Sequence, residues 1–306
     1  MLPQHSKKFK ALRDLIRARA ESASGEIIYI PNKGNGGDSF ITEGTYQFVE
    51  DLGLPWRMQT LLDPVPEGSH IILGGGGNLV APYPNYRDFL TQNMHRWASL
   101  VLLPHTIRAY PEILGALNDT CDIYCRESPS LDYCKEHLTG GARLHECHDM
   151  AFYWQPERTK AEVSGAVLAN LTDRTYLIRA AKFLVRDRLA TRLIRDGKLL
   201  ALREDVESAG VLVPEHSVDV SQIFSTEGVT RKYAASATWA MSRLLDKADV
   251  VETDRLHAAV MSALLGKKVF MRDNSYGKNR SIWEYSMKDI FPNVELLDGT
   301  DDVRLT

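Results

Sequence analysis

The chain has 306 residues, of which 44% are hydrophobic and 25% are charged, and its formal net charge at pH 7 is −3. These values are typical of a soluble protein with about two domains. They argue against a non-specific nucleic-acid binder, which would carry a large basic excess, and no apolar run reaches the ~20 residues of a membrane span.

The first predicted element is a basic amphipathic helix over residues 1–20, with Phe9, Leu12, Leu15 and Ile16 on one face. The segment lacks the apolar centre and the small-residue cleavage site of a signal peptide, so we expect a cytoplasmic protein. The basic face could meet an anionic membrane surface. We favour the simpler alternative that this helix packs on its own domain.

Strands and helices then alternate through the first half of the chain. The predicted strands cover residues 25–31, 69–73, 99–103 (ended by Pro104), 122–126 and 144–150, and the predicted helices cover 40–52, 85–97, 110–118 and 128–137. This alternation is typical of an α/β fold with a parallel sheet, in which ligands bind at the carboxyl ends of the strands. The loops that follow the strands should therefore share one edge.

The second half repeats this pattern after a less ordered stretch that follows Trp154-Gln155-Pro156-Glu157, which we interpret as a linker or a domain crossing. The predicted elements are a basic amphipathic segment at 174–196, mainly a solvated face, then strands at 198–202, 248–251 and 267–271, an extended segment at 217–223, and helices at 231–246, 258–265 and 281–287. We therefore expect two domains, 1–155 and 156–306, that face each other across a cleft, with the last helix free to pack back on the first domain.

Two glycine-rich loops follow predicted strands of the first domain. Asp38, after two glycines, is a candidate base toward a sugar hydroxyl or a simple N-cap of the next helix. Four consecutive glycines at 74–77 cost backbone entropy on ordering, so Gly75, Gly76 and the following Asn78 are candidate ligand contacts. Neither loop matches the dinucleotide fingerprint or the phosphate loop.

Three further side chains follow strands of the first domain. His105 is either a site residue or a histidine hydrogen-bonded to backbone, and Arg126 either binds an anion or pairs with a neighbouring carboxylate. Ser128 is a plausible N-cap before a proline. Asp149 is a candidate for the interdomain cleft.

The four cysteines, at positions 121, 125, 134 and 147, fit no paired zinc-binding pattern. Cys147 with His145 and His148 is the one trio whose spacing would suit a metal, and reduced thiols are the favoured alternative.

The most specific motif lies between the strand at 248–251 and the helix at 258–265. It reads Thr-Asp-Arg-Leu-His over 253–257 and delivers Asp254, Arg255 and His257 to the start of a helix, where free N–H groups favour anions. Arg255 adds a forked donor and His257 a proton carrier. Arg203 and Lys278 follow other strands of this domain and are further candidate cations. The simpler alternative for Arg203 is a surface ion pair with Asp205, and for the loop with Lys278 it is a plain turn.

Taken in order, these motifs resemble the polysaccharide pyruvyltransferases over about residues 25–285. The resemblance is carried by the N-x-G-D loop, Gly74–Asn78, the Leu-Pro-His-Thr-Ile run at 103–107, Arg126-Glu127-Ser128, Asp149-Met150-Ala151, Leu202-Arg203, the 253–257 motif and the late loop with Lys278. One departure is Pro104-His105-Thr106, where many members have Pro-Gln-Ser.

This resemblance implies two Rossmann-like domains arranged as in GT-B glycosyltransferases, and transfer of a pyruvyl group from phosphoenolpyruvate to sugar hydroxyls as a cyclic ketal in surface-polysaccharide synthesis. It implies that Arg255 and His257 contact phosphoenolpyruvate, and it implies the same, on a weaker motif match, for Arg203. The acceptor would bind on the first domain and the donor on the second. No cofactor or metal is required, and a lipid-linked saccharide acceptor would bring the enzyme to the inner face of the plasma membrane.

Phosphoenolpyruvate carries a phosphate and a carboxylate, which suits Arg255, Arg203, Lys278 and Arg126. We expect His257 to protonate the enol carbon or to bind the phosphate, and Asp254 to orient its neighbours rather than act as the base.

Two other functions stay open at this point. A GT-B glycosyltransferase that uses a nucleotide sugar would fit the two domains and the glycine loops equally well. A non-catalytic saccharide-binding protein of the same fold fits less well, because binding alone does not need the proton carrier His257.

Overall fold

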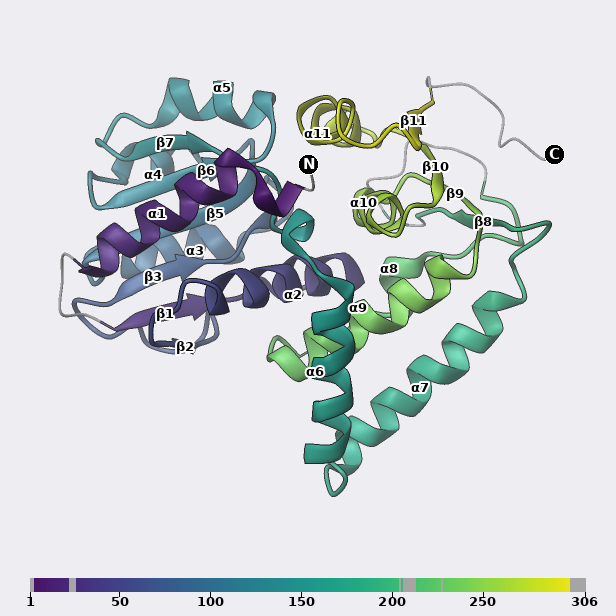
Figure 1. The fold of residues 1–306 in the computed structure, drawn as a ribbon. Coiled ribbons are helices and arrows are strands. Elements are labelled where there is room, and N and C mark those ends of the chain that lie inside the picture. Colours follow the sequence, from purple (N-terminus) through teal and green to yellow (C-terminus); the bar gives the residue numbers. More distant parts are fainter. Residues whose placement is uncertain (1–2, 22–25, 204, 206–212, 227, 298–306) are drawn as a thin grey trace. The chain divides into compact units, whose positions relative to one another are not determined.

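A computed structural model describes residues 3–21, 26–203, 205, 213–226 and 228–297. The chain forms two compact units, one of Met1–Asn32 with Gly44–Trp154 and the other of Lys33–Glu43 with Gln155–Thr306 (Figure 1). The segment Lys33–Glu43 therefore packs with the second unit. Residues 1–2 and 25, where the first predicted helix and strand begin, lie outside the described residues.

The first unit contains a seven-stranded parallel sheet in the order β2-β1-β3-β5-β6-β7, with β4 paired to β5. Its strands are β1 (Ile27–Ile30), β2 (Trp56–Met58), β3 (His70–Leu73), β4 (Gly76–Leu79), β5 (Ser99–Ile107), β6 (Cys121–Cys125) and β7 (Arg143–Glu146). Its helices are η1 (Pro3–His5), α1 (Lys7–Glu21), α3 (Asn85–Asn93), α4 (Pro111–Ala116), α5 (Ser128–His137) and η2 (Met150–Tyr153), together with the part of α2 (Gly36–Glu50) from Gly44 on. The predicted parallel α/β sheet is confirmed.

Alternate residues of the strands pack on opposite faces of this sheet. Ile28, Ile71 and Leu100 lie in one core with side chains of α3, α4 and α5. Tyr29 faces the other way and meets the ring of Tyr46 on α2 edge-on at 5.2 Å. A parallel sheet covered on both faces needs strands that are apolar throughout, and β1 is buried at all four positions.

The first helix packs on its own unit, as we favoured from the sequence. Phe9 and Leu12 of α1 are completely buried and Ile16 almost so. The ring of Phe9 lies 5.2 Å from that of Tyr153 and 6.3 Å from that of Phe48. The apolar face of α1 is therefore part of the core.

The prediction that Pro104 ends its strand was wrong. β5 continues to Ile107, and its pairing with β6 shifts register between Leu102 and His105. A proline has no N–H to donate to the ladder, so a sheet tolerates it at such an irregularity. Beyond it, β5 pairs with β4, so the glycine segment predicted as a loop is partly a strand.

The second unit contains a four-stranded parallel sheet in the order β11-β10-β9-β8. Its strands are β8 (Lys198–Ala201), β9 (Val250–Thr253), β10 (Lys268–Met271) and β11 (Val294–Leu296), and its helices are α6 (Pro156–Ala169), α7 (Arg174–Thr191), α8 (Val220–Ile223), α9 (Arg231–Asp246), α10 (Leu256–Leu264) and α11 (Lys278–Ser286). The short β11 was not predicted.

The stretch after Trp154 is predicted from the sequence to be a linker or a domain crossing. It is a crossing, because the units divide between Trp154 and Gln155, but it is not irregular: Pro156 starts helix α6, where the missing proline N–H costs nothing. A second sequence prediction for this unit was wrong. The segment 217–223 is not extended throughout, because the Asp219 side chain accepts the Gln222 N–H and caps the short helix α8.

No helix in the described part of the chain is long and apolar enough to cross a membrane. All four cysteines are buried and carry free thiols. His145 hydrogen-bonds to Asp122 at 2.9 Å, and among the described residues no three His, Cys, Asp or Glu side chains are placed to hold a metal ion, the trio with Cys147 included.

Candidate functional site

In the second unit, the polar motif at 253–257 joins the ends of two strands. The Thr253 hydroxyl donates to the Ala201 carbonyl and accepts the Arg255 N–H at 2.9 Å. The Asp254 carboxylate accepts the Arg203 N–H at 2.8 Å. Because β8 and β9 are parallel neighbours, these bonds fix the positions at which both arginines leave the sheet.

The two arginines form a buried network with two aspartates. The guanidinium of Arg203 binds Asp205 through two nitrogens, at 2.7 and 3.2 Å. Arg255 binds Asp205 at 2.8 Å and also makes a bidentate pair with Asp219. The sequence suggested a surface ion pair for Arg203, but its side chain is buried. Two positive and two negative charges balance, and Asp205 is the most exposed member.

Burial raises the pKa of Asp254 to about 6, although the backbone N–H of Arg203 and the charges of both arginines oppose this shift. The side chain is 1% exposed. A carboxyl held out of water that accepts the Arg203 backbone N–H is suited to orient this residue. Its perturbed pKa is a feature that functional sites often share.

His257 lies at the second position of α10 and faces the first turn of α2. A Cβ atom at Gly37 would come within 2.7 Å of the His257 Nδ1, so only glycine fits there. The ring of Phe40 meets the imidazole edge-on at 6.4 Å. His257 is thus close to two helix N-termini, whose free N–H groups favour anions.

The start of α2 is fixed by a reciprocal cap. The Asn35 side chain accepts the Gly37 N–H at 2.8 Å, and the Asp38 carboxylate accepts the Asn35 N–H at 2.9 Å. This capping box starts α2 at Gly36, earlier than the predicted residue 40. Asp38 therefore has the capping role that we weighed against that of a base.

Lys278 begins α11 in the polar loop after β10. Its N–H donates to the Asn274 side chain at 2.8 Å, and its ammonium group lies 5.2 Å from the Tyr276 ring centre. The next residue, Asn279, donates to the carbonyls of Asp254 and Arg272 at 2.7 and 2.9 Å. Asn279 thus ties this loop to the 253–257 motif.

In the first unit, a chain of hydrogen bonds crosses the carboxyl ends of the strands. The Asn78 side chain donates to Asn32, after β1, and the Asn78 N–H donates to the His105 Nε2 at 2.8 Å. Arg126 donates to the Thr106 hydroxyl at 2.9 Å and pairs with Asp149. The strand-end residues expected to share one edge do so.

His105 in this chain is uncharged. Complete burial, together with the nearby charge of Arg126, lowers its pKa to about 3. The Nε2 accepts a backbone N–H, so the imidazole is held as a neutral acceptor. This is the backbone-bonded histidine that the sequence allowed as an alternative.

The glycines at 74–77 have reasons within the fold. A Cβ at Gly74 would lie 2.8 Å from the Asn32 nitrogen, and one at Gly75 would lie 2.7 Å from the Pro104 oxygen. Gly76 has a φ angle of 138°, a backbone conformation that residues with a side chain rarely adopt. Close backbone packing thus accounts for Gly74 and Gly75, and a positive φ accounts for Gly76, so the number of glycines alone is no evidence for a ligand.

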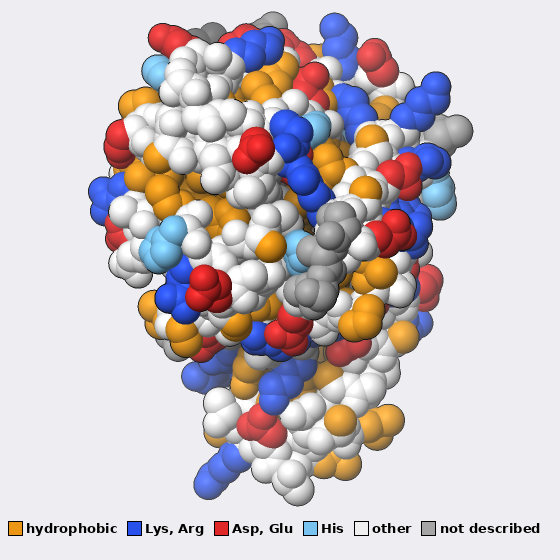
Figure 2. Space-filling view, turned by 90° about the vertical axis from the view of Figure 1, so that its left-hand side faces the viewer, with side chains coloured by type: hydrophobic (Ala, Val, Ile, Leu, Met, Phe, Trp, Pro, Cys, Tyr) orange, Lys and Arg blue, Asp and Glu red, His pale blue; other side chains and the backbone are white. Residues whose placement is uncertain are grey.

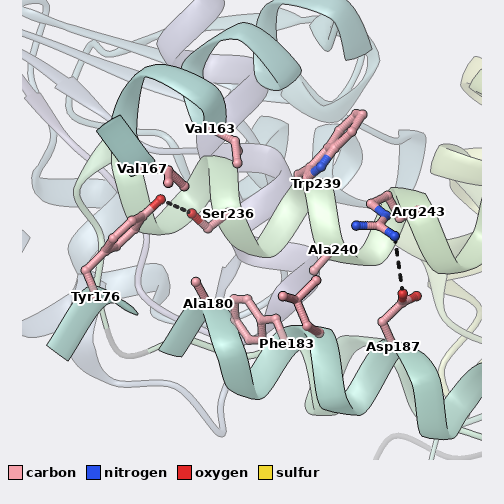
Figure 3. A pocket seen from close by; sticks show the side chains of 11 residues that line it. Val163, Val167, Tyr176, Ala180, Phe183, Asp187, Ser236, Trp239, Ala240 and Arg243 are labelled. Atoms are coloured by element: carbon pink, nitrogen blue, oxygen red, sulfur yellow. Dashed lines mark hydrogen bonds and ion pairs between the residues drawn. The ribbon is translucent and has the colours of Figure 1, made fainter. Parts of the chain in front are cut away.

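A pocket of about 190 Å³ lies elsewhere in the second unit, between α6, α7 and α9 (Figure 3). Its walls are mainly apolar, with a hydrogen bond between Tyr176 and Ser236 at one end and the Asp187–Arg243 pair at the other. It contains none of the predicted site residues.

The surface drawn in Figure 2 carries acidic and basic side chains that are interspersed. This agrees with the small net charge of the chain.

Sequence reasoning missed three residues of the second unit's site. Asp219 and Asn279 are invisible as partners in the sequence, because each reaches a group far away along the chain. Asn35 had a local signal, since an Asn three residues before an Asp is a capping-box pattern in which Asp replaces the usual Glu or Gln.

The sequence was compared with known protein families and structures. The model of the family described as Polysaccharide pyruvyl transferase matches residues 6–276. The chain is 25% identical to "Putative pyruvyl transferase EpsO" of Bacillus subtilis (strain 168), over 95% of this chain and 92% of that protein. The crystal structure of a functionally uncharacterised protein, KP1_0663, from Klebsiella pneumoniae subsp. pneumoniae NTUH-K2044 matches with a TM-score of 0.73 and 26% identity, over 95% of this chain and 99% of that one.

The family match spans most of the chain and includes the Arg255 and His257 positions. The chain belongs to the polysaccharide pyruvyl transferase family and is a transferase.

Proposed function

We propose that this transferase moves the pyruvyl group of phosphoenolpyruvate to two hydroxyls of a saccharide, forming a cyclic ketal and releasing phosphate. The observation that carries the proposal is the position of His257, beside the N-termini of both α2 and α10 and two residues from the buried Arg255. Helix N-termini favour a phosphate or carboxylate, and an imidazole can deliver a proton near neutral pH.

Donor binding has to disturb the arginine network, because its charges already balance. Asp205 presents a carboxylate to both Arg203 and Arg255, and it is the member of the network most open to solvent. We propose that the carboxylate or phosphate of phosphoenolpyruvate takes the place of Asp205 on these two guanidinium groups. Asp219 then keeps Arg255 aligned through its bidentate pair.

The chemistry follows from the electron pair of the enol double bond. This pair takes a proton from His257 at the CH2 carbon, which becomes a methyl group, and the neighbouring carbon becomes electron-poor. One sugar hydroxyl adds to that carbon and loses its proton. The C–O bond to phosphate breaks and the second hydroxyl adds and loses its proton. Of the two hydroxyl protons, one returns to His257 and the other goes to the released phosphate. A positioned acid contributes roughly 10²–10⁴-fold to such a step.

The other candidate residues have assigned places in this proposal. Asp254 orients Arg203 through its backbone bond, Lys278 neutralises donor charge, and Asp38 serves as a base or only as a cap. The acceptor is assigned to the first unit, near Gly75, Gly76, Asn78, His105, Arg126 and Asp149, and the two units are proposed to face each other as in GT-B enzymes. The acceptor is proposed to be lipid-linked, and no cofactor or metal is assigned.

Two measurements test the proposal. Calorimetric titration should detect phosphoenolpyruvate binding that Arg255→Gln weakens. His257→Ala should lower phosphate release with a saccharide acceptor by roughly 10²–10⁴-fold, while His95→Ala, at an exposed position of the first unit, should not. Mass spectrometry of the acceptor should show a gain of pyruvate less one water. Tight binding of a nucleotide sugar with no response to phosphoenolpyruvate would instead support a glycosyltransferase.

A further inference from the structure

Helix α7 is held in the second unit by one face only. Tyr176, Phe183 and Ala190 on that face are buried, and the first two line the pocket shared with α6 and α9 (Figure 3). Asp187 is also on this inner side and pairs with Lys247 at 2.7 Å. The remaining circumference of this 18-residue helix faces away from the unit's core.

The outer face of α7 carries an exposed apolar stripe. Ile178, Val185 and Leu189 are 49%, 57% and 56% exposed. Their spacing of seven and four residues places them on one side of the helix. Leu168 and Leu171, at the end of α6 and in the turn before α7, are also exposed. Single exposed apolar residues are ordinary, but a contiguous set marks an interaction surface.

Basic side chains border this stripe on both sides. At 100° per residue, Lys182 and Arg186 lie on one side of it and Arg188 and Arg192 on the other. Among the described residues, Lys182, Arg188 and Arg192 form no ion pair. The single acidic residue of α7 is Asp187, which is buried. The outer face is therefore apolar and positive, with no acidic side chain of its own.

Helix α1, also basic, differs in this respect. Its large apolar residues Phe9, Leu12 and Ile16 are buried. Arg19 pairs with Asp122 at 2.9 Å, and Arg17 donates to the Leu52 carbonyl at 3.0 Å. Arg17 and Arg19 of α1 are thus held by partners in their own unit. On α7, Arg186 donates to the Ile223 carbonyl at 2.6 Å, and Lys182, Arg188 and Arg192 are exposed.

We propose that the outer face of α7, formed by Ile178, Val185 and Leu189 between rows of lysine and arginine, docks on an anionic lipid bilayer. A helix lying in a bilayer interface has this pattern, with apolar side chains among the acyl chains and cations among the headgroups. Two copies of α7 would bring like charges together, and a nucleic acid would leave the apolar stripe against phosphates. This inference goes beyond the proposed pyruvyl transfer and does not depend on it.

Vesicle sedimentation of the full chain tests this proposal. One set of vesicles contains about one third phosphatidylglycerol in phosphatidylcholine, and the other contains phosphatidylcholine alone. The variants are Arg188→Gln with Arg192→Gln, and Val185→Glu. The matched controls are Lys135→Gln and Leu62→Glu, at exposed positions of the first unit. Circular dichroism checks that each variant is folded.

The wild type should bind the anionic vesicles and lose binding as salt rises from about 0.1 to about 0.5 M. Each basic residue removed should lower the partition coefficient about fivefold, so the double variant should lose about 25-fold. Val185→Glu should lose at least about tenfold, and both controls should bind like the wild type. Wild-type binding that is absent, insensitive to salt, or weakened equally by the controls would overturn the proposal. Two other results would also overturn the proposal. One is a dimer in light scattering that the α7 variants dissociate and the controls do not, and the other is preferential binding of the protein to nucleic acid.

Discussion

Replacing Asp254 by asparagine should stabilise the fold at neutral pH. The pKa of this carboxyl is about 6 in the folded chain, against an ordinary value of 3.8, because the group is buried. Below pH 3.8 the acid is protonated in both states, so burial has little cost. As the pH rises from 3.8 to 6, the unfolded chain releases its proton first, so stability falls. Above pH 6 the loss is complete, at about 3 kcal/mol.

The Asp254→Asn variant carries no charge at this position, and its side-chain oxygen can still accept the Arg203 N–H. Urea unfolding at pH 8 should therefore show a gain of about 3 kcal/mol over the wild type, and at pH 5 about half of that. The pyruvyl transferase activity should fall, because a neutral amide accepts the Arg203 N–H more weakly than a carboxylate and so orients Arg203 less firmly.

The control is Asp119→Asn, an exposed carboxyl of the first unit, which should change stability by less than about 0.5 kcal/mol at either pH. A variant that is less stable than the wild type at pH 8, or whose advantage is the same at pH 5 and pH 8, would refute the reasoning from burial.

Three further predictions concern stability and are measured by thermal or urea unfolding. Gly44→Ala should destabilise the fold by more than about 1 kcal/mol, because the new Cβ would lie 2.3 Å from a backbone oxygen. Gly165 is another helical glycine but has open space around it, so Gly165→Ala should stabilise the fold by about 0.5–1 kcal/mol. Equal effects of the two substitutions would contradict the argument from this contact. Asp149→Ala should cost about 3–5 kcal/mol, because it leaves Arg126 as a buried, uncompensated charge, and a cost below about 1 kcal/mol would mean that the pair is open to water. The pKa of His105 is lowered from 6.5 to about 3, so its contribution to the free energy of unfolding should be full above pH 6.5 and fall as the pH drops toward 3. Between pH 7 and pH 5 the wild type should therefore lose about 2 kcal/mol more stability than His105→Gln. Equal losses in the two proteins would show that this histidine is not the cause.

The sequence determined the parts of this protein that depend on neighbours along the chain. The period of apolar residues predicted α9 at its observed bounds, and strands alternating with helices predicted parallel sheets. The succession of strand-end motifs indicated the family. Local chemistry also determines the helix starts at Pro156, which begins α6, and at Asn35, which caps α2.

Only the tertiary structure decided which partner each polar group has. Asp254 holds the backbone of Arg203, 51 residues away, and Asp219 aligns Arg255 across 36 residues. Neither pairing leaves a pattern in the sequence, because a hydrogen bond between strand ends depends on sheet order and register. The same holds for Gly74 and Gly75 of the glycine tetrad, where packing brings backbone atoms within 3 Å of the place that a Cβ atom would take. The sequence specified which chemical groups reach the edge of each sheet, and packing decided which of them are buried, paired or left facing solvent.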